Sequence, residues 1–155
     1  MYWNILIATD GSVLSDKSVS TGVALAKHLG ATVTVVHVTE PWATDFPPGP
    51  TKEPFWVKEL TEDPLWVKYN DACAARAATI LDAAAQRAGD VGVACNVRHV
   101  PNSYPADGIL EAADACGCDL IIMSSHGRRG IARFVMGSQT QEVLVRTKLP
   151  VLICR

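Results

Sequence analysis

The sequence lacks three features that mark large classes of protein: a long apolar run, a basic cluster and a signal peptide. No continuous apolar stretch approaches the ~20 residues that a membrane-spanning helix needs, which argues against a membrane protein. No run of Lys or Arg is longer than two residues and the net charge is -2, so we expect no nucleic-acid partner. Residues 1–7 have neither the charged start nor the long apolar stretch of a signal peptide, and we expect a cytoplasmic protein.

The cysteines do not form the pattern of a disulfide framework. Five is an odd count, and most of them lie in apolar or helical contexts, which predicts buried free thiols. Cys116 and Cys118 are spaced like a redox or metal pair, but no histidine partner follows at zinc-type spacing, and we expect no metal site. The alternative that we favour is a helix that ends at Cys116, with Gly117 in the left-handed conformation after it.

The chain does contain a regular alternation of strands and helices within 155 residues, a length that leaves room for one domain. Short apolar runs typical of strands occur at residues 5–8, 33–38, 93–100, 120–123 and 151–154. Helical patterns open near Ser12 or Ser15 and stop at Gly30, run from Tyr69 to Ala88 before Gly89, start at Pro105, and start at Ser138. This order predicts an α/β fold, a single domain over residues 1–155 with a five-stranded parallel sheet and helices on both faces.

Residues 39–64 interrupt the alternation with an irregular, proline-rich insertion. An acid-Pro-apolar-Trp-Val-Lys pattern occurs there at residues 53–58 and again at 63–68. Its tryptophans, Trp56 and Trp66, are candidates for a lid or for an anchor that binds an unknown protein partner. The alternative that we favour is that each proline starts a helical turn whose tryptophan packs on the body of the protein.

A loop after the fourth predicted strand is the strongest functional signal. It runs from Met123 through Gly127 to the cationic residues Arg128, Arg129 and Arg133, and Gly137 and Ser138 follow. Ser138 and Gln141 fit a capping box, so a helix is predicted to start there. A strand, a loop and a helix N-terminus together present free backbone N–H groups and the positive end of a helix dipole, which suits phosphate.

A second loop, Thr9 to Ser12, follows the first predicted strand. In parallel sheets, ligands bind beyond the carboxyl ends of the strands where the strand order reverses, and both loops lie at such ends. Asp10 is either a ligand contact or a turn residue, because Asp-Gly-Ser is common turn chemistry. The presence of the other loop favours the ligand contact.

These residues resemble the universal stress protein family over nearly the whole chain outside the insertion. The similarity rests on residues 5–12, 119–128, 137–138 and 150–153. The ATP-binding branch of that family carries a Gly, two residues, a Gly, nine residues, then Gly-Ser or Gly-Thr. Here Ser124, Gly127 and Gly137-Ser138 stand at those positions, so a serine replaces the first glycine. The resemblance implies a Rossmann-like fold of the adenine nucleotide alpha hydrolase-like type, with ATP and Mg2+ as ligands.

The resemblance also implies which residues hold the nucleotide. Ala8, Thr9 and Asp10 would line the site after the first strand, and Val38 would touch the adenine. Met123, Ser124 and Gly127 would approach the ribose and phosphates, with Arg128 as a cationic donor beside them. The phosphates would be held by Gly137, Ser138, Gln139 and Thr140. If position 124 keeps β geometry, a serine is comfortable there, whereas a positive φ would cost roughly 1 kcal/mol.

Three functions remain open at this point. The leading one is an ATP-binding regulatory or signalling module of the stress response, and the alternatives are a nucleotide-independent dimeric scaffold and a slow ATPase or self-phosphorylating enzyme. Fast catalysis is not indicated, because Ser124, Ser125 and His126 are contiguous and no acid is identifiably placed to orient the histidine. Residues 151–154 are wholly apolar, and we expect them to form an edge strand that pairs antiparallel in a homodimer, as the resemblance also implies.

Overall fold

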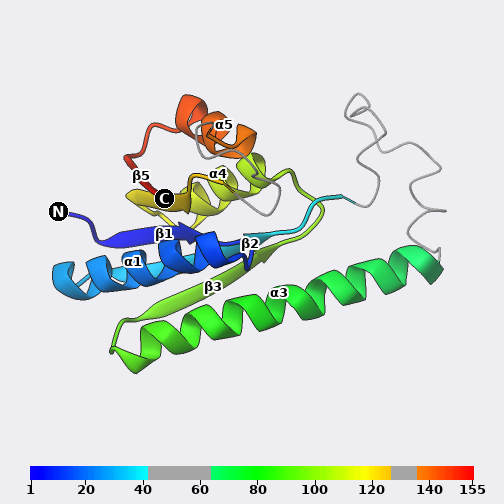
Figure 1. The fold of residues 1–155 in the computed structure, drawn as a ribbon, viewed down its shortest axis with the longest axis horizontal. Coiled ribbons are helices and arrows are strands. Elements are labelled where there is room, and N and C mark those ends of the chain that lie inside the picture. Colours follow the sequence, from blue (N-terminus) through cyan, green and yellow to red (C-terminus); the bar gives the residue numbers. More distant parts are fainter. Residues whose placement is uncertain (42–63, 127–135) are drawn as a thin grey trace.

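The computed structural model describes residues 1–41, 64–126 and 136–155. In this part of the chain a five-stranded parallel sheet has the strand order β3-β2-β1-β4-β5 (Figure 1). The strands are β1 (Asn4–Ala8), β2 (Thr32–Val38), β3 (Cys95–Val100), β4 (Leu120–Ser124) and β5 (Val151–Cys154). The predicted α/β fold with a parallel sheet is confirmed.

Helices cover both faces of the sheet. They are α1 (Val13–Leu29), α3 (Pro64–Asp90), α4 (Pro105–Ala115) and α5 (Ser138–Arg146). α1 and α3 lie on one face and α4 and α5 on the other (Figure 1). Alternate residues of β1 enter different cores: Ile5 and Ile7 pack on the α1–α3 side, and Leu6 packs on the α4–α5 side. Burial on both faces explains why the central strands are apolar without alternation.

The helix ends follow the capping residues that the sequence contains. The Ser12 hydroxyl accepts a hydrogen bond from the Ser15 backbone N–H at 3.2 Å, and α1 ends at Gly30 with φ 67°. Cys116 ends α4 and Gly117 follows it with φ 62°, which confirms the structural interpretation of this pair. All five cysteines are free as predicted, but only Cys118 is buried and the other four are half-buried. Burial raises the pKa of the Cys118 thiol to about 11.

Two element boundaries differ from the predicted ones. α3 begins at Pro64 and continues past Gly89, because its alanine-rich face packs in the core and a proline at the first helical turn loses no hydrogen bond. A helical start at the second proline of the repeat is thereby confirmed, and Trp66 is half-buried there, whereas Trp56 lies outside the described residues. β3 begins at Cys95, because the Val93 N–H bonds the Ala88 carbonyl at 2.9 Å in the turn that leaves α3.

The predicted capping box at the start of α5 is wrong. Gly137 is the N-cap, with extended backbone and no side-chain hydrogen bond, and Ser138 is already the first helical residue. The Gln141 side chain instead donates to the Met136 carbonyl at 3.1 Å. Within the described residues no hydrogen bond involves the Ser138 hydroxyl, so this group stays available at the helix N-terminus.

Two further findings concern the described residues alone. None of their helices is long and apolar enough to cross a bilayer. They also contain no cluster of three or more His, Cys, Asp or Glu side chains arranged to hold a metal ion.

Candidate functional site

A cavity of about 620 Å³ opens at the carboxyl ends of the strands. The chain leaves β1 toward α1 on one face and leaves β4 toward α5 on the other, so the cavity lies where ligands bind in folds of this kind. Every predicted site residue that the structure describes lines it, namely Ala8, Thr9, Asp10, Val38, Met123, Ser124, Gly137, Ser138, Gln139 and Thr140. Gly127 and Arg128 lie outside the described residues, as do Arg129 and Arg133.

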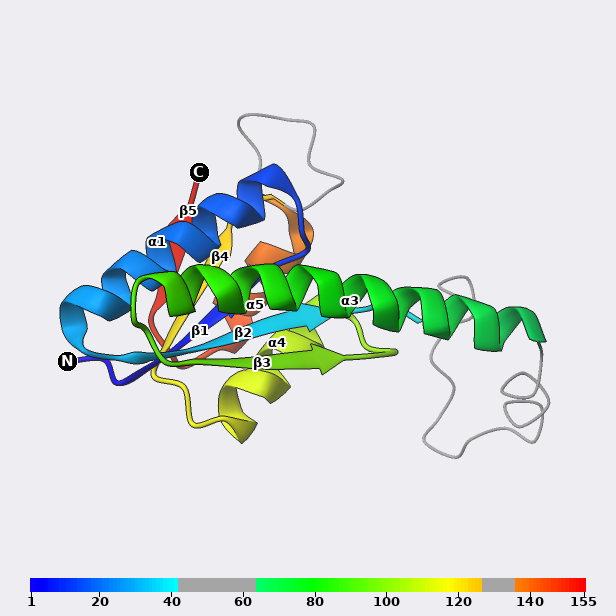
Figure 2. The same ribbon diagram turned by 90° about the horizontal axis from the view of Figure 1, so that it is seen from below.

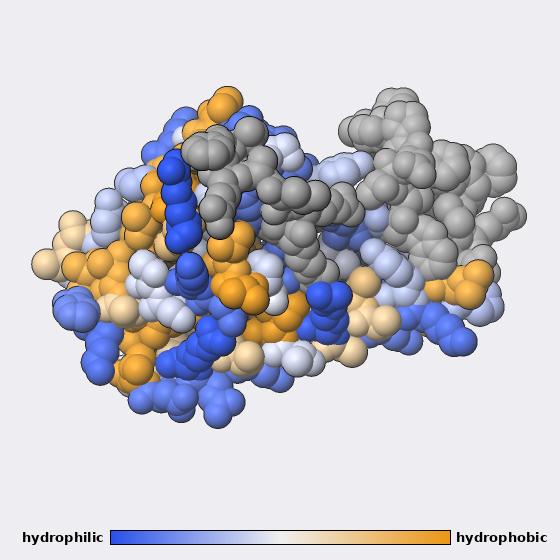
Figure 3. Space-filling view, viewed as in Figure 1, coloured by the Kyte–Doolittle hydropathy of each residue, from blue (hydrophilic) through white to orange (hydrophobic). Residues whose placement is uncertain are grey.

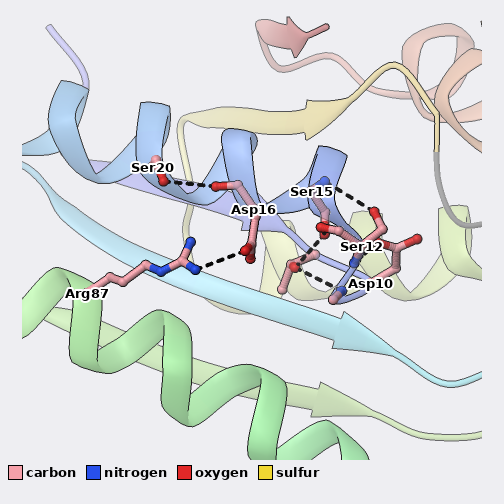
Figure 4. Close-up of polar contacts among 8 residues, drawn as sticks. Asp10, Ser12, Ser15, Asp16, Ser20 and Arg87 are labelled. Atoms are coloured by element: carbon pink, nitrogen blue, oxygen red, sulfur yellow. Dashed lines mark hydrogen bonds and ion pairs between the residues drawn. The ribbon is translucent and has the colours of Figure 1, made fainter.

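The loop after β1 forms one wall of the cavity through a set of short-range hydrogen bonds (Figure 4). The Asp10 carboxylate accepts from the Ser12 N–H at 2.9 Å, and the Thr9 hydroxyl lies 3.0 Å from the Ser15 hydroxyl. Asp10 therefore has the turn role that its sequence context predicts. Its half-buried side chain also borders the cavity, so the two roles are compatible.

Gly11 allows this loop to approach α3. It has φ 76°, and a Cβ atom at this position would lie 2.7 Å from the Ile80 Cδ1. A side chain is therefore excluded both by backbone conformation and by space. The close contact is with the middle of α3, and the preceding turns of α3 line the cavity through Tyr69, Cys73 and Arg76.

The N-terminus of α5 forms the opposite wall. The Gly137 N–H bonds the Ser125 carbonyl at 2.9 Å, and the Thr140 hydroxyl donates to the Ser124 carbonyl at 3.1 Å. The Gln139 side-chain oxygen accepts from the Ala106 N–H at 3.0 Å, which ties α5 to α4. The side chains of Gln139 and Thr140 thus hold the helix in place, while the first backbone N–H groups of α5 have no partner within the helix.

A third wall contains residues that sequence reasoning missed. The lining also includes Ser15, Val36 and, from α4, Pro105 and Ile109. Its polar members are His37, Thr39 and Glu40 at the end of β2 and Tyr69, Cys73 and Arg76 on α3. The Tyr69 hydroxyl donates to the Glu40 carbonyl at 3.3 Å, and burial followed by the hydrogen bond to Cys73 raises the pKa of Tyr69. Helical spacing places 69, 73 and 76 on one face, and these residues line the cavity. No sequence signal shows that α3 extends beyond the sheet, as Figure 2 shows it does.

Charge is distributed unevenly around the cavity. The described lining contains two carboxylates, Asp10 and Glu40, and one guanidinium, Arg76, all at the end formed by β1, β2 and α3. The other end has no charged side chain among its described residues and instead receives the positive end of the α5 dipole. The geometry therefore suits a ligand with an anionic group at α5 and a neutral, hydrogen-bonding group at the opposite end.

The model of the universal stress protein family matches residues 1–155. The chain belongs to this family. Universal stress protein YxiE of Bacillus subtilis is 30% identical over 158 residues, and the match covers 100% of both proteins. The family resemblance of the sequence motifs is confirmed.

Solved structures of other universal stress proteins share the fold. UspA from Lactobacillus plantarum has a TM-score of 0.80 at 22% identity, covering 99% of this chain and 98% of that one. A universal stress protein in complex with cAMP has a TM-score of 0.65 at 23% identity, covering 99% and 97%. The Archaeoglobus fulgidus protein in complex with dAMP has a TM-score of 0.64 at 20% identity, covering 99% and 98%.

The serine that replaces the first glycine of the universal stress protein motif fits its position. Ser124 is the last residue of β4, and among the described non-glycine residues only Asn102 has a positive φ. The expected β geometry is therefore confirmed. The Ser124 hydroxyl donates to the His126 carbonyl at 2.7 Å, so it stabilises the turn into the loop.

Proposed function

We propose that this universal stress protein is a cytoplasmic ATP-binding regulatory module of the stress response. The observation that carries the proposal is the single cavity to which the β1 loop, the end of β4 and the N-terminus of α5 all contribute. Family members of the same fold bind cAMP and dAMP, which supports an adenine nucleotide as the ligand class. Ten of the proposed ligand contacts are described lining residues: Ala8, Thr9, Asp10, Val38, Met123, Ser124, Gly137, Ser138, Gln139 and Thr140.

The ligand orientation follows from charge. Phosphates belong at α5, where Gly137 and Ser138 begin the helix, because backbone N–H groups and the helix dipole attract anions. Gly127 and Arg128 would complete this end, with Mg2+ bound to the phosphates. The adenine belongs at the other end, against Val38, where apolar contact and the Asp10 carboxylate suit a base.

The first experiment identifies the ligand. Mass spectrometry of small molecules released from the denatured, purified protein should detect an adenine nucleotide. Calorimetric titration with Mg-ATP should then show one site per chain, and Gly127→Val should abolish it. A protein that carries no nucleotide and binds none would support the nucleotide-independent scaffold instead.

A slow ATPase or self-phosphorylating enzyme is the other alternative for the same cavity. The Ser125 hydroxyl lies 3.1 Å from Nδ1 of His126, but this contact joins neighbours in the chain and forms part of a turn. We therefore expect binding without rapid turnover. Phosphate release or phosphoprotein formation under excess Mg-ATP would favour the enzyme.

A homodimer through the β5 edge is part of the proposal. Within residues 1–41, 64–126 and 136–155, β5 is the last strand of the sheet and pairs only with β4, so no described strand pairs with the backbone groups of its other edge. Two exposed apolar side chains, Val13 and Leu152, lie in this part of the molecule, and apolar surface is visible in the space-filling view (Figure 3). Leu152 also borders an open groove of about 710 Å³ between α1 and β5.

Light scattering tests this assembly. The wild-type protein should be a dimer at micromolar concentration, and a double change of Leu152→Lys and Ile153→Lys should shift it to the monomer, because like charges would meet across the twofold axis. The matched control is Val97→Lys, on the opposite edge strand β3, where an exposed apolar residue is also replaced. A monomeric wild type would overturn the dimer.

A further inference from the structure

A histidine of the third wall of the cavity, His37, stacks on a second histidine, His99, which does not itself line the cavity. His37 on β2 and His99 on β3 are register partners, and their rings lie 6.1 Å apart between centroids with an interplanar angle of 29°. His37 is only 6% exposed and lines the cavity. Because histidine changes charge between about pH 5 and 8, the pair is a titratable element within the cavity wall.

Each ring is bonded to a residue of the cavity lining. His37 Nδ1 lies 2.8 Å from the Thr9 carbonyl oxygen, which only accepts, so Nδ1 carries the proton. His99 Nε2 lies 2.8 Å from the Thr39 hydroxyl. His37 therefore holds the backbone just before Asp10, and His99 holds the side chain of Thr39, which follows Val38, so the two rings support residues on both sides of the proposed base site.

Among the described residues, charged and titratable groups face the pair from the β1 loop, from the end of β2 and from α3. Asp10 and Glu40 carry negative charge, Arg76 carries positive charge, and Tyr69 and Cys73 are the other titratable groups that line this end. Arg98 and Glu111 pair with each other at 3.5 Å, and Arg98 points to the opposite face of β3 from His99. The two carboxylates partly compensate the positive charge that a first proton would add to the pair. Burial and the neighbouring ring make this protonation less favourable.

We infer that His37 and His99 are positioning residues whose neutral stacked form is required for ligand binding, so that affinity falls when the pair takes up a proton. The inference rests on the proposed function. A base against Val38 and Asp10 would replace the water beside His37 and make a charged ring less favourable. By reciprocity, a ligand that disfavours protonation is itself bound less tightly by the protonated protein.

The pKa of His99 supports this direction, because burial lowers it below the ordinary value. An unfolded histidine titrates near pH 6.5, so the stability contributed by neutral His99 is complete above that pH and is lost as the pH falls toward the folded value. Melting temperatures at each pH therefore separate loss of fold from loss of affinity.

The test is calorimetric titration with Mg-ATP at pH 7.5, 6.5 and 5.5 for the wild type and His99→Gln. We expect the wild-type affinity to fall about tenfold more than that of the variant, since a pKa difference of one unit between free and bound forms is a factor of ten. Titration of the ligand's own phosphates affects both proteins equally, so it cancels when the pH dependence of the wild type is compared with that of the variant. His28→Gln, an exposed position on α1 that bonds the Ala24 carbonyl, is the matched control and should behave like the wild type.

A second measurement does not depend on a variant. In an NMR titration of the histidine ring protons, Mg-ATP should lower the apparent pKa values of the His37–His99 pair. Equal pH dependence in wild type and His99→Gln, or pKa values that the ligand does not change, would overturn the inference while leaving nucleotide binding intact. Absence of any Mg-ATP binding at pH 7.5 would instead overturn the proposed function, and the inference with it.

Discussion

The two ends of the cavity are built in different ways. The described part of the α5 end comes from the end of β4 and the N-terminus of α5, and its proposed role depends mainly on backbone N–H groups and a helix dipole. The β2–α3 end is assembled from residues 37–40 and 69–76, and it contributes side chains: imidazole, carboxylate, phenol, thiol and guanidinium. The α5 end is therefore suited to hold any phosphate, whereas selectivity for the rest of the ligand has to arise at the β2–α3 end.

Among changes at the described residues, the largest effect should come from a charge placed at the α5 end. Ser138→Asp puts a carboxylate beside the proposed phosphates, and two charges 4 Å apart interact by about 1 kcal/mol in water and about 4 kcal/mol at an effective dielectric constant of 20. We expect Mg-ATP affinity to fall by at least tenfold in calorimetry. The same change should leave the fold intact or stabilise it by about 0.3–1 kcal/mol, because an acid favours a helix N-terminus.

Ser138→Asn is the matched control for that change, since it has the same shape without the charge. It should bind Mg-ATP within a few-fold of the wild type. Equal affinity of the Asp and Asn variants would mean that the anionic group does not lie at α5.

At the other end, Asp10→Ala should weaken Mg-ATP binding by about 1–3 kcal/mol, the range for loss of a hydrogen bond to a charged or buried group. It should also lower the melting temperature, because the carboxylate accepts from the Ser12 N–H. Asp10→Asn keeps that acceptor and separates the two roles. A full loss of affinity in Asp10→Asn with an unchanged melting temperature would assign the carboxylate to the ligand, and unchanged affinity in both variants would leave only the turn role.

The wall behind Val38 can be moved without touching a polar group. A Cβ atom at Gly108 would lie 2.8 Å from both Val38 Cγ atoms, so Gly108→Ala should force Val38 toward the cavity and cost about 1–3 kcal/mol of stability through overpacking. Affinity for Mg-ATP should fall while affinity for inorganic triphosphate stays the same. The control is Gly89→Ala, a helical position with open space around it, which should change neither the affinity for Mg-ATP nor that for triphosphate. If Gly108→Ala weakens the binding of both ligands equally, a base site at Val38 is contradicted.

The smallest effect is expected at Tyr69. Tyr69→Phe removes the hydrogen bond to the Glu40 carbonyl and should cost about 0.5–1.5 kcal/mol in the free energy of unfolding, measured by urea denaturation. Affinity should fall only slightly if α3 merely supports the end of β2. A loss as large as that of Asp10→Ala would instead show that the hydroxyl contacts the ligand.

The loops of the site were predictable because each signal lies within a few residues of chain. Residues 9–12 and 124–140 each follow an apolar strand, and glycine, serine and aspartate after a strand are typical of turns. The capping box at Ser138 was wrong for a related reason. An N-cap and a first helical residue differ by one position, and the backbone of Gly137, not the side-chain pattern, decided between them.

The strands, the order of the helices, the loop after β1 and the start of α5 could be read from the sequence, because strand burial and helix capping depend on neighbouring residues. The β2–α3 end was decided only by tertiary structure. α3 extends beyond the sheet because its packing residues, Ala77 to Ala88, lie in its second half, while Gly11 admits Ile80 and so aligns the first half with the end of β2. Helical periodicity specifies which face Tyr69, Cys73 and Arg76 share, but the position of that face depends on packing between segments that are distant in the chain.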